Sequence, residues 1–200
     1  MDYSLKCFYE NGEEKDWGRL QAVQLVDVVT GEPVIEETQV KVCWDADALY
    51  IRFDGRDDYV VSRYIDRDDP LYEQDVVEIF IDVEGTGRHY LEFELSPHNV
   101  LFDARIDNKE GKITVHTDWD AEGLVTSVRT EGDRKIYDWK IPFADIGQVP
   151  EEGTTWRVNF YRIDEDREGK RHYQAWSPTG VANYHIPLRF GNLVFTTETA

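Results

Sequence analysis

Apolar and polar residues alternate with a period of two through most of the chain, and this pattern constrains the fold more than any other feature. β-Branched and aromatic residues carry it, and they suit the pleated, half-buried surface of a sheet. We expect a β-strand in each of eight segments: TQVKVCW (38–44), ALYIRFDG (48–55), DVVEIFIDV (75–83), HYLEFELS (89–96), LVTSVRT (124–130), KIYDWKIP (135–142), WRVNFYRID (156–164) and GNLVF (191–195).

Turn-forming sequences separate these segments at intervals of roughly ten residues. They are rich in Gly, Pro, Asn and Asp, as in FDGRDD (53–58), VEGTG (83–87) and DREGK (166–170). One helical turn is expected in IPFADIG (141–147), where Pro142 suits a first helical position and Gly147 a stop. Many short strands at this spacing predict an all-β sandwich or barrel.

The length and the composition suit one domain. The chain has 200 residues, of which 40% are hydrophobic, and all-β sandwiches often reach this length without dividing. This is enough apolar material to form a core despite the high net charge. We therefore expect a single domain over residues 1–200, and we see no linker or repeat within it.

The charge excludes several classes of partner. There are 41 acidic and 22 basic residues, a net charge of −19, and the basic residues form no cluster that could bind nucleic acid or an anionic membrane. No apolar run approaches the roughly 18 residues of a membrane span. The N-terminus resembles no signal peptide, so the sequence fits an extracellular protein whose signal was removed or a cytoplasmic chain complete as written. Charge repulsion opposes association and an apolar patch would favour it, so the oligomeric state is open.

Signatures of common enzyme classes are absent. The chain has no GxSxG, GxxxxGK[ST], HExxH or GxGxxG motif, and its five histidines lack metal-ligand spacing. Its two cysteines, Cys7 and Cys43, exclude a CxxC site. A buried thiol at Cys43 and a Cys7–Cys43 disulfide are both compatible with the sequence.

Acidic segments raise the possibility of calcium, which takes clustered carboxylate and carbonyl oxygens. Three segments have this character: DRDDP (66–70), DWDAEG (118–123) and DEDREG (164–169). The last two open like EF-hand loops, but Arg129 and Ala175 stand where the twelfth-position Glu belongs, so an EF-hand is excluded. A structural calcium ion in a β-loop and a solvated acidic turn both stay open.

Carboxylates and aromatic residues suggest two kinds of site, a catalytic carboxylate pair and a sugar-binding surface. Glu92 and Glu94 share one face of their strand and Glu78 could lie on its neighbour, which suggests a glycosidase pair, although pairs arise by chance among 41 carboxylates. Trp176 in AWSPTG (175–180) and Tyr72 in DDPLYEQD (68–75) lie near loops. Exposed rings there would suit the C–H face of a sugar, although Trp176 could equally be buried.

Three blocks in order resemble the family 9 carbohydrate-binding modules and the wider group of carbohydrate-binding-9-like domains. The blocks are VCWDADALYIRFDGRD (42–57), DPLYEQDVVEIFIDVEG (69–85) and WSPTGVANYHIPLRFGNLVF (176–195). The resemblance covers nearly the whole chain from about residue 17. It implies a jelly-roll type β-sandwich of two antiparallel sheets that binds saccharides without hydrolysing them. It also implies a terminal sugar held between two aromatic rings, with calcium ions stabilising loops elsewhere.

The resemblance also implies individual site residues. Trp176 matches one ring, Tyr72 matches the other, which is usually Trp, and Glu78 matches a carboxylate that accepts hydrogen bonds from sugar hydroxyls. Glu94 and Tyr161 stand near the positions of Arg and amide residues in sugar-clamping members, and this reverses the hydrogen-bond demand on the ligand.

Arg162 is a further candidate, because it could restore the missing cation. β-Alternation places it on the opposite face of its strand from Tyr161. A salt bridge to Glu78 or to another buried carboxylate is therefore an equally good reading of this residue.

The sequence thus predicts a non-catalytic carbohydrate-binding module with a saccharide ligand and no required cofactor. The alternative is an acidic accessory domain of the same fold with a vestigial sugar site. A haem-binding module of DOMON type, from the same fold group, is disfavoured because the only methionine for an axial ligand is Met1. The identity of the saccharide, and whether chain ends or interiors are bound, stay open.

Overall fold

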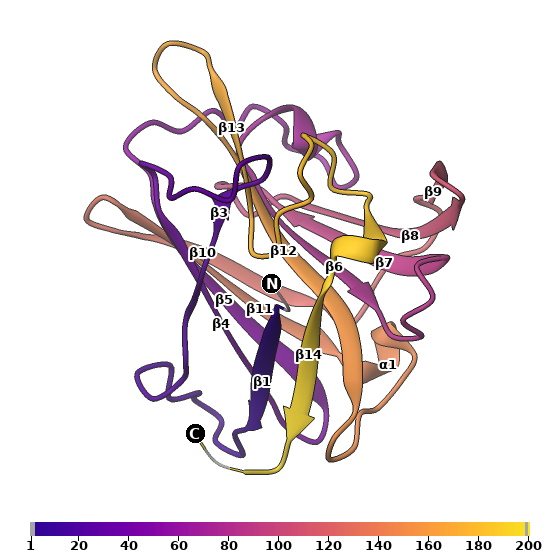
Figure 1. Cartoon of the computed structure of the whole chain (residues 1–200). Coiled ribbons are helices and arrows are strands. Elements are labelled where there is room, and N and C mark those ends of the chain that lie inside the picture. The colour runs from indigo at the N-terminus through magenta and orange to yellow at the C-terminus, as the bar shows by residue number, and fades with distance from the viewer. Residues whose placement is uncertain (1–2, 199) are drawn as a thin grey trace.

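β-Strands form most of the protein, and hydrogen bonds join them into one network (Figure 1). The computed structural model describes residues 3–198 and residue 200. The strands are β1 (Ser4–Tyr9), β2 (Val23–Gln24), β3 (Val26–Asp27), β4 (Thr38–Trp44), β5 (Ala48–Arg56), β6 (Val76–Asp82), β7 (His89–Leu95), β8 (Leu101–Lys109), β9 (Lys112–His116), β10 (Val125–Glu131), β11 (Arg134–Pro142), β12 (Thr155–Glu165), β13 (Arg171–Ala175) and β14 (Gly191–Thr196). Each of the eight predicted segments forms a strand.

The strand order explains how one network encloses a core. The order is β10-β11-β5-β4-β1-β14-β12-β6-β7-β8-β9, and β13 pairs with β12 beside this path. Neighbours are antiparallel except at β1, which runs parallel to both β4 and β14. The sheet curls so that β5 faces β12, where the rings of Phe53 and Phe160 meet at 6.0 Å. The all-β class is confirmed, but β1 joins the two halves, so they are not two separate antiparallel sheets.

Two apolar clusters lie on opposite faces of β12. The larger fills the space between the two halves of the sheet and contains Phe53, Trp139 and Phe160. The second lies on the outer face of β6, β7, β8 and β12, and includes Phe80 and Tyr161. Successive side chains of a strand point to opposite faces, so Phe160 serves the inner cluster and Tyr161 the outer one. The outer cluster forms the floor of the site described below.

The helical content is small. Helix α1 spans Phe143–Ile146, where a turn was predicted, and it ends at Gly147, whose φ of 87° favours glycine. Pro142 was expected at the first helical position, but it is the N-cap, one position before the first helical residue. Two 3₁₀ turns, η1 (Leu71–Glu73) and η2 (Pro187–Arg189), complete the described helical elements. None of the helices in the described part of the chain is long and apolar enough to cross a membrane.

Both cysteines are buried free thiols, so the disulfide alternative is wrong. Cys7 lies on β1 and Cys43 on β4. Burial raises the pKa of the Cys43 thiol to about 12. The thiol therefore stays protonated near neutral pH and packs as a small hydrophobe.

Candidate functional site

A pocket of about 550 Å³ opens on the outer face of β6, β7 and β12, beyond the second apolar cluster. This volume falls in the usual range for small-molecule sites. Its polar lining comes from the loop before η1, from β6, β7 and β13, and from the loop before β14. Its aromatic lining comes from η1, β8, β13 and the loop before β14. The residues used below are Tyr72, Glu78, Glu92, Glu94, Arg171, Tyr173, Tyr184 and His185.

Three glutamates form the floor of the pocket. Glu78 on β6 lies directly opposite Glu94 on β7, and Glu92 lies two residues earlier on the same face of β7. At least one carboxylate oxygen of each lies within 4.8 Å of the other two. The residues are only 2%, 5% and 1% exposed for Glu78, Glu92 and Glu94. We call these three residues the acidic triad.

Burial changes the acidity of the triad. It raises the pKa of Glu92 to about 8. Burial, followed by the charges of the other members of the triad, raises the pKa of Glu94 well above its usual range. Burial and then the charge of Glu92 do the same to the pKa of Glu78, against a smaller lowering by Arg171. Near neutral pH the triad therefore retains protons that exposed glutamates would have lost.

The triad also has unused acceptor capacity. Glu78 Oε1 and both carboxylate oxygens of Glu94 are buried and form no hydrogen bond of normal geometry with the described part of the chain. The backbone N–H of Tyr72 and the carboxyl group of Glu92 nevertheless lie close enough to shift the pKa of Glu94, the first downward and the second upward. Buried polar atoms normally have partners, since leaving one unpaired costs on the order of 1–3 kcal/mol. The pocket is therefore suited to a ligand that brings hydrogen-bond donors to this floor.

Tyrosines form the walls of the pocket. Tyr72, on η1, is 50% exposed. Tyr173 on β13 meets Tyr184 edge to face, with ring centroids 6.3 Å apart. Arg171 connects the walls, because its guanidinium donates to the carbonyl of Tyr72 and lies 5.3 Å from the ring centroid of Tyr173.

His185 closes the pocket beside Glu92. Its Nδ1 lies 2.8 Å from the hydroxyl of Tyr90, and its Nε2 lies 3.9 Å from Glu92 Oε1. Burial lowers the pKa of His185 to about 4. The imidazole is therefore neutral near pH 7, and Arg171 is left as the charged cation next to the triad.

A comparison with known proteins identifies the family to which this chain belongs. The sequence model of the family described as "Carbohydrate family 9 binding domain-like" matches residues 11–198. The chain belongs to this family. An extracellular protein of Arthroderma benhamiae is 27% identical over 176 residues, which cover 80% of this chain and 78% of that protein. Endo-1,4-beta-xylanase A of Thermoanaerobacterium saccharolyticum is 25% identical over 181 residues, which cover 90% of the family 9 domain but 14% of the xylanase.

Solved structures show the same fold. A family 9 module from Caldicellulosiruptor kristjanssonii, in complex with cellotriose, superposes with a TM-score of 0.73 at 18% identity. The match covers 98% of this family 9 domain and 95% of that chain. A family 9 module from the same organism, in complex with glucose, also gives a TM-score of 0.73 at 18% identity, covering 98% and 97% of the two chains.

The family 9 domain brings three of the six predicted site residues together in the pocket: Tyr72, Glu78 and Glu94. Tyr161 lies one layer deeper. Its ring stacks on Tyr184 at 3.9 Å between centroids, and its hydroxyl donates to the Tyr184 carbonyl at 2.9 Å. Tyr161 is fully buried, so it supports the wall of the pocket from beneath and does not line it.

The reading of Trp176 as an exposed platform is wrong. The residue is 4% exposed and belongs to the inner cluster. Its ring lies 5.6 Å from that of Phe160 and 6.1 Å from that of Tyr3, measured between centroids. Ala175, its predecessor on β13, faces the outer cluster, and alternation turns the next side chain inward.

Arg162 also lies away from the pocket, on the inner face of β12 as alternation predicts. Its Nη2 lies 2.5 Å from Asp164 Oδ1 and 3.5 Å from Asp57 Oδ2. Its Nη1 donates to the carbonyl of Arg56 at 2.6 Å. The salt bridge to another buried carboxylate is thus confirmed, whereas a bridge to Glu78 and a role in the pocket are wrong.

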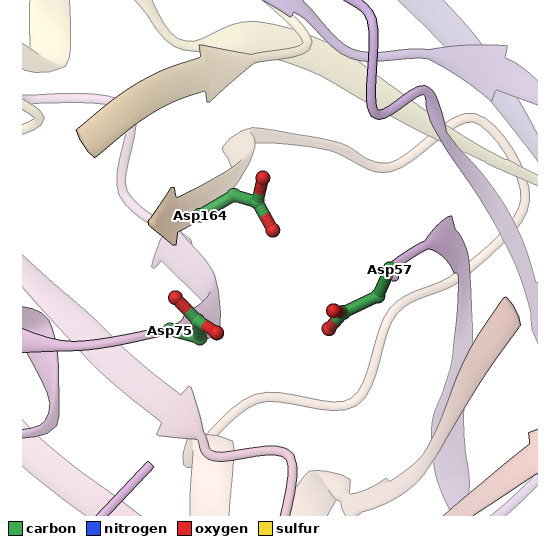
Figure 2. Close-up of side chains that lie close together, drawn as sticks. All are labelled: Asp57, Asp75 and Asp164. Atoms are coloured by element: carbon green, nitrogen blue, oxygen red, sulfur yellow. The ribbon is translucent and has the colours of Figure 1, made fainter. Parts of the chain in front are cut away.

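The carboxylates around Arg162 form a second acidic group. Figure 2 shows Asp57, Asp75 and Asp164 turned toward a common space. Burial raises the pKa of Asp57 to about 6, against a lowering by Arg162, and raises that of Asp75 to about 7. Asp75 accepts hydrogen bonds from the backbone N–H groups of Val61 and Glu165 at 2.6 and 2.8 Å.

A third acidic group joins two of the segments considered for calcium. Asp68 and Asp120 meet Asp103 of β8, but Arg67 bridges Asp103 at 2.5 Å and Asp120 at 3.2 Å. Calcium favours six to eight oxygen ligands and no competing cation. Arg162 pairs with the second group and Arg67 with the third, so each group already contains a competing cation, and its residues fit an arginine-centred cluster better than a calcium site.

Sequence reasoning missed Arg171, Tyr173 and Tyr184 as site residues. The first two alternate in RHYQA (171–175) onto the face of Tyr161, so the period of two could have found them once their strand was recognised. Tyr184 lies in a loop, and no local pattern marks it. The third triad member, Glu92, was noticed only as part of a chance carboxylate pair.

Proposed function

We propose that this family 9 domain binds a saccharide in the pocket and does not hydrolyse it. The observation that carries this proposal is the convergence of the half-exposed ring of Tyr72 with three buried carboxyl groups, of which Glu78 and Glu94 have acceptors without a hydrogen bond of normal geometry. The C–H face of a sugar packs on an aromatic ring, and its hydroxyls supply donors. Tyr72 stacks on the sugar, with Tyr173 on the facing wall, while Glu78, Glu92 and Glu94 accept hydrogen bonds from its hydroxyls.

The family supports a ligand of the glucose type. The Caldicellulosiruptor module was solved with cellotriose and with glucose, and a pocket of about 550 Å³ can admit the end of a chain. We therefore propose a chain end as the bound unit. Contacts of this size usually give dissociation constants of roughly 10⁻⁶ to 10⁻³ M.

The arrangement of the triad supports binding over catalysis. Glycosidases place two carboxyl groups on either side of the scissile bond, about 5–9 Å apart, with one of them ionised. Here the three carboxyl groups converge within 4.8 Å on one wall. Burial raises the pKa of each of them, so none is an obvious ionised nucleophile or base.

A second candidate function is an acidic accessory domain with a vestigial sugar site. The observation that favours it is Glu94, which stands near the position where sugar-clamping members carry an Arg or amide residue. Replacing donors by acceptors could have abolished binding of the ancestral sugar. The two candidates differ in one measurable respect, which is saturable binding of a saccharide.

Calorimetric titration with glucose, cello-oligosaccharides and xylo-oligosaccharides tests the proposal. Calorimetry is preferable to tryptophan fluorescence because no tryptophan of the described chain lines the pocket. We expect Tyr72→Ala to weaken binding roughly tenfold or more, a loss of about 1.4 kcal/mol. Tyr59→Ala, at an exposed tyrosine outside the pocket, is the matched control and should bind normally.

Two results would contradict the proposal. A flat response of the wild-type domain to the whole panel would favour the accessory-domain function. The appearance of reducing ends during incubation with the oligosaccharides would show hydrolysis, and the non-catalytic part of the proposal would then be wrong.

A further inference from the structure

Acidic groups outnumber basic groups around the pocket floor. Glu78 comes from β6, Glu92 and Glu94 come from β7, and Asp68 also lines the pocket from the loop before η1. The charged cation facing them is Arg171 from β13. Its guanidinium already donates a hydrogen bond to the carbonyl of Tyr72 and lies over the ring of Tyr173. His185, from the loop before β14, contributes no charge near neutral pH because burial lowers its pKa to about 4.

The spacing of the triad suits an ammonium group. Because each pair of the nearest carboxylate oxygens is within 4.8 Å, one point lies no more than about 2.8 Å from all three atoms, which matches the length of charge-assisted N–H···O hydrogen bonds. An ammonium group donates three such bonds, whereas a hydroxyl donates one. A single primary amine could therefore satisfy all three glutamates at once.

The unpaired atoms point to the same ligand. Glu78 Oε1 and both oxygens of Glu94 are buried without a hydrogen bond of normal geometry, and both residues line the pocket. A neutral sugar would leave the triad protonated or carrying uncompensated buried charge, which is costly. A cationic ligand supplies both the donors and the charge, and tyrosine walls favour an organic cation through contact with their rings.

We infer that the pocket prefers a saccharide with a free amino group, such as a glucosamine unit, to the corresponding neutral sugar. This inference rests on the proposed function and names the ligand class for the same site. The ammonium group lies over the acidic triad while the sugar ring packs on Tyr72. As it binds, a protonated carboxyl group of the triad releases its proton to solvent, and the resulting carboxylate pairs with the ammonium.

A bare divalent cation is the competing occupant. Three carboxylate oxygens are fewer than calcium normally takes, and the remaining lining that the structure describes is largely aromatic and aliphatic. Such a wall stabilises an organic ligand, whereas an inorganic ion would find only Asp68, Asn183 and His185 beside the triad and would be repelled by Arg171. Binding of calcium alone is therefore an outcome that the experiment must separate from binding of the amine.

The experiment compares glucosamine, N-acetylglucosamine and glucose by calorimetry in EDTA at about pH 6, below the usual range of amine pKa values. We expect glucosamine to bind roughly tenfold or more tightly than glucose, and N-acetylglucosamine no more tightly than glucose, because acetylation removes the charge. The glucosamine heat should vary with the ionisation enthalpy of the buffer, which reports the released proton.

Variants then locate the preference. Glu94→Gln removes one carboxylate at nearly constant shape, and we expect it to reduce the ratio of glucosamine to glucose affinity roughly tenfold. Glu131→Gln, on β10 at the far edge of the sheet, is the matched control and should keep the wild-type ratio. If Glu94→Gln fails to fold, Glu78→Gln serves instead, and the comparison of ligands on the wild-type domain needs no variant.

Each other result overturns a defined part of the proposal. Glucose binding as tightly as glucosamine would overturn the inference and leave the proposed function intact. No binding of any sugar would overturn both. Saturable binding of calcium chloride in EDTA-free buffer, lost in Glu94→Gln and accompanied by no preference for glucosamine, would overturn the inference in favour of a metal site.

Discussion

At the scale of the residue, the carboxyl group of Glu94 is buried against those of Glu78 and Glu92. Its backbone is held by strand pairing between β6 and β7, so it cannot move out to water as a loop residue could. Charge inside a protein that lacks a full set of partners opposes folding. The pocket therefore carries a cost in stability that depends on pH.

We predict that Glu94→Gln stabilises the domain at high pH. When the pKa of a carboxyl group is higher in the folded protein than in the unfolded chain, its contribution to stability is complete below the unfolded pKa. The contribution is lost as the pH rises through the folded pKa, which is about 8 for Glu92. The free energy of unfolding of the wild type should fall between about pH 5 and 9. In the variant this fall should be smaller by at least about 1.4 kcal/mol, which corresponds to a shift of one pKa unit.

Urea unfolding at several pH values measures this difference. Asp57 and Asp75 titrate in the same direction, but they are present in both proteins, so the difference isolates the triad. Parallel stability curves for the two proteins would show that the triad does not titrate as described.

Trp176 leads to a prediction of a different kind. Trp176→Ala should lower the free energy of unfolding by about 3–5 kcal/mol, because it empties a large site in the inner cluster. Trp17→Ala is the control, since Trp17 is only partly buried and packs on the exterior beside Arg52. If urea unfolding showed Trp176→Ala to be as stable as the wild type, the core assignment of Trp176 would be wrong.

At the scale of elements, β12 connects the pocket to the core. One face of the strand carries Tyr161 beneath the pocket wall, and the other carries Arg162 within the second acidic group. Their separation results from alternation alone. A change on one face can therefore alter stability without touching the ligand.

We predict that Arg162→Met costs about 3–5 kcal/mol of stability near pH 8, because it leaves Asp57 and Asp164 buried without their cation. The cost should be smaller at pH 5, since Asp57, with a pKa of about 6, is then mostly protonated. Urea unfolding at both pH values measures it.

The control for this prediction is Arg129→Met, which breaks exposed ion pairs on β10. Exposed pairs contribute about 0–1 kcal/mol. An equal effect of the two substitutions, or no dependence on pH for Arg162→Met, would contradict the role assigned to Arg162.

The sequence predicts most strands because their pattern is local. The eight predicted segments alternate over five to nine residues, and all of them form strands. Six strands lie outside those segments, namely β1, β2, β3, β8, β9 and β13. Of these, β1 pairs in parallel with β4 and with the distant β14. Such pairing depends on the closed sheet and leaves little local signal, so the continuous network was not predicted.

The site was predictable where it depends on strand register and not where it depends on loops. Alternation on β7 and the family resemblance identified Glu78 and Glu94. The error at Trp176 came from treating it as a loop residue. Its backbone N–H still donates to Phe160 O at 2.9 Å, which continues the strand by one residue and turns the ring inward. Tyr184 could not be found, because only the folded loop brings it to the pocket.

At the scale of the whole molecule, the net charge of −19 acts together with the pocket. A strongly negative protein raises the local concentration of cations and repels anions. Acidic polysaccharides are therefore poor partners for this domain, whereas cationic ones approach it favourably. This long-range effect has the same sign as the preference inferred from the acidic triad.

The parallel pairing of β1 with β14 has a mechanical consequence. The two strands lie side by side and run in the same direction (Figure 1), with Ser4 paired to Asn192 and Phe8 paired to Thr196. Tension applied through the two chain ends therefore acts along the strands, in shear, and loads all the hydrogen bonds between them at once instead of one after another. A domain built in this way resists forced extension better than one whose terminal strands separate one hydrogen bond at a time.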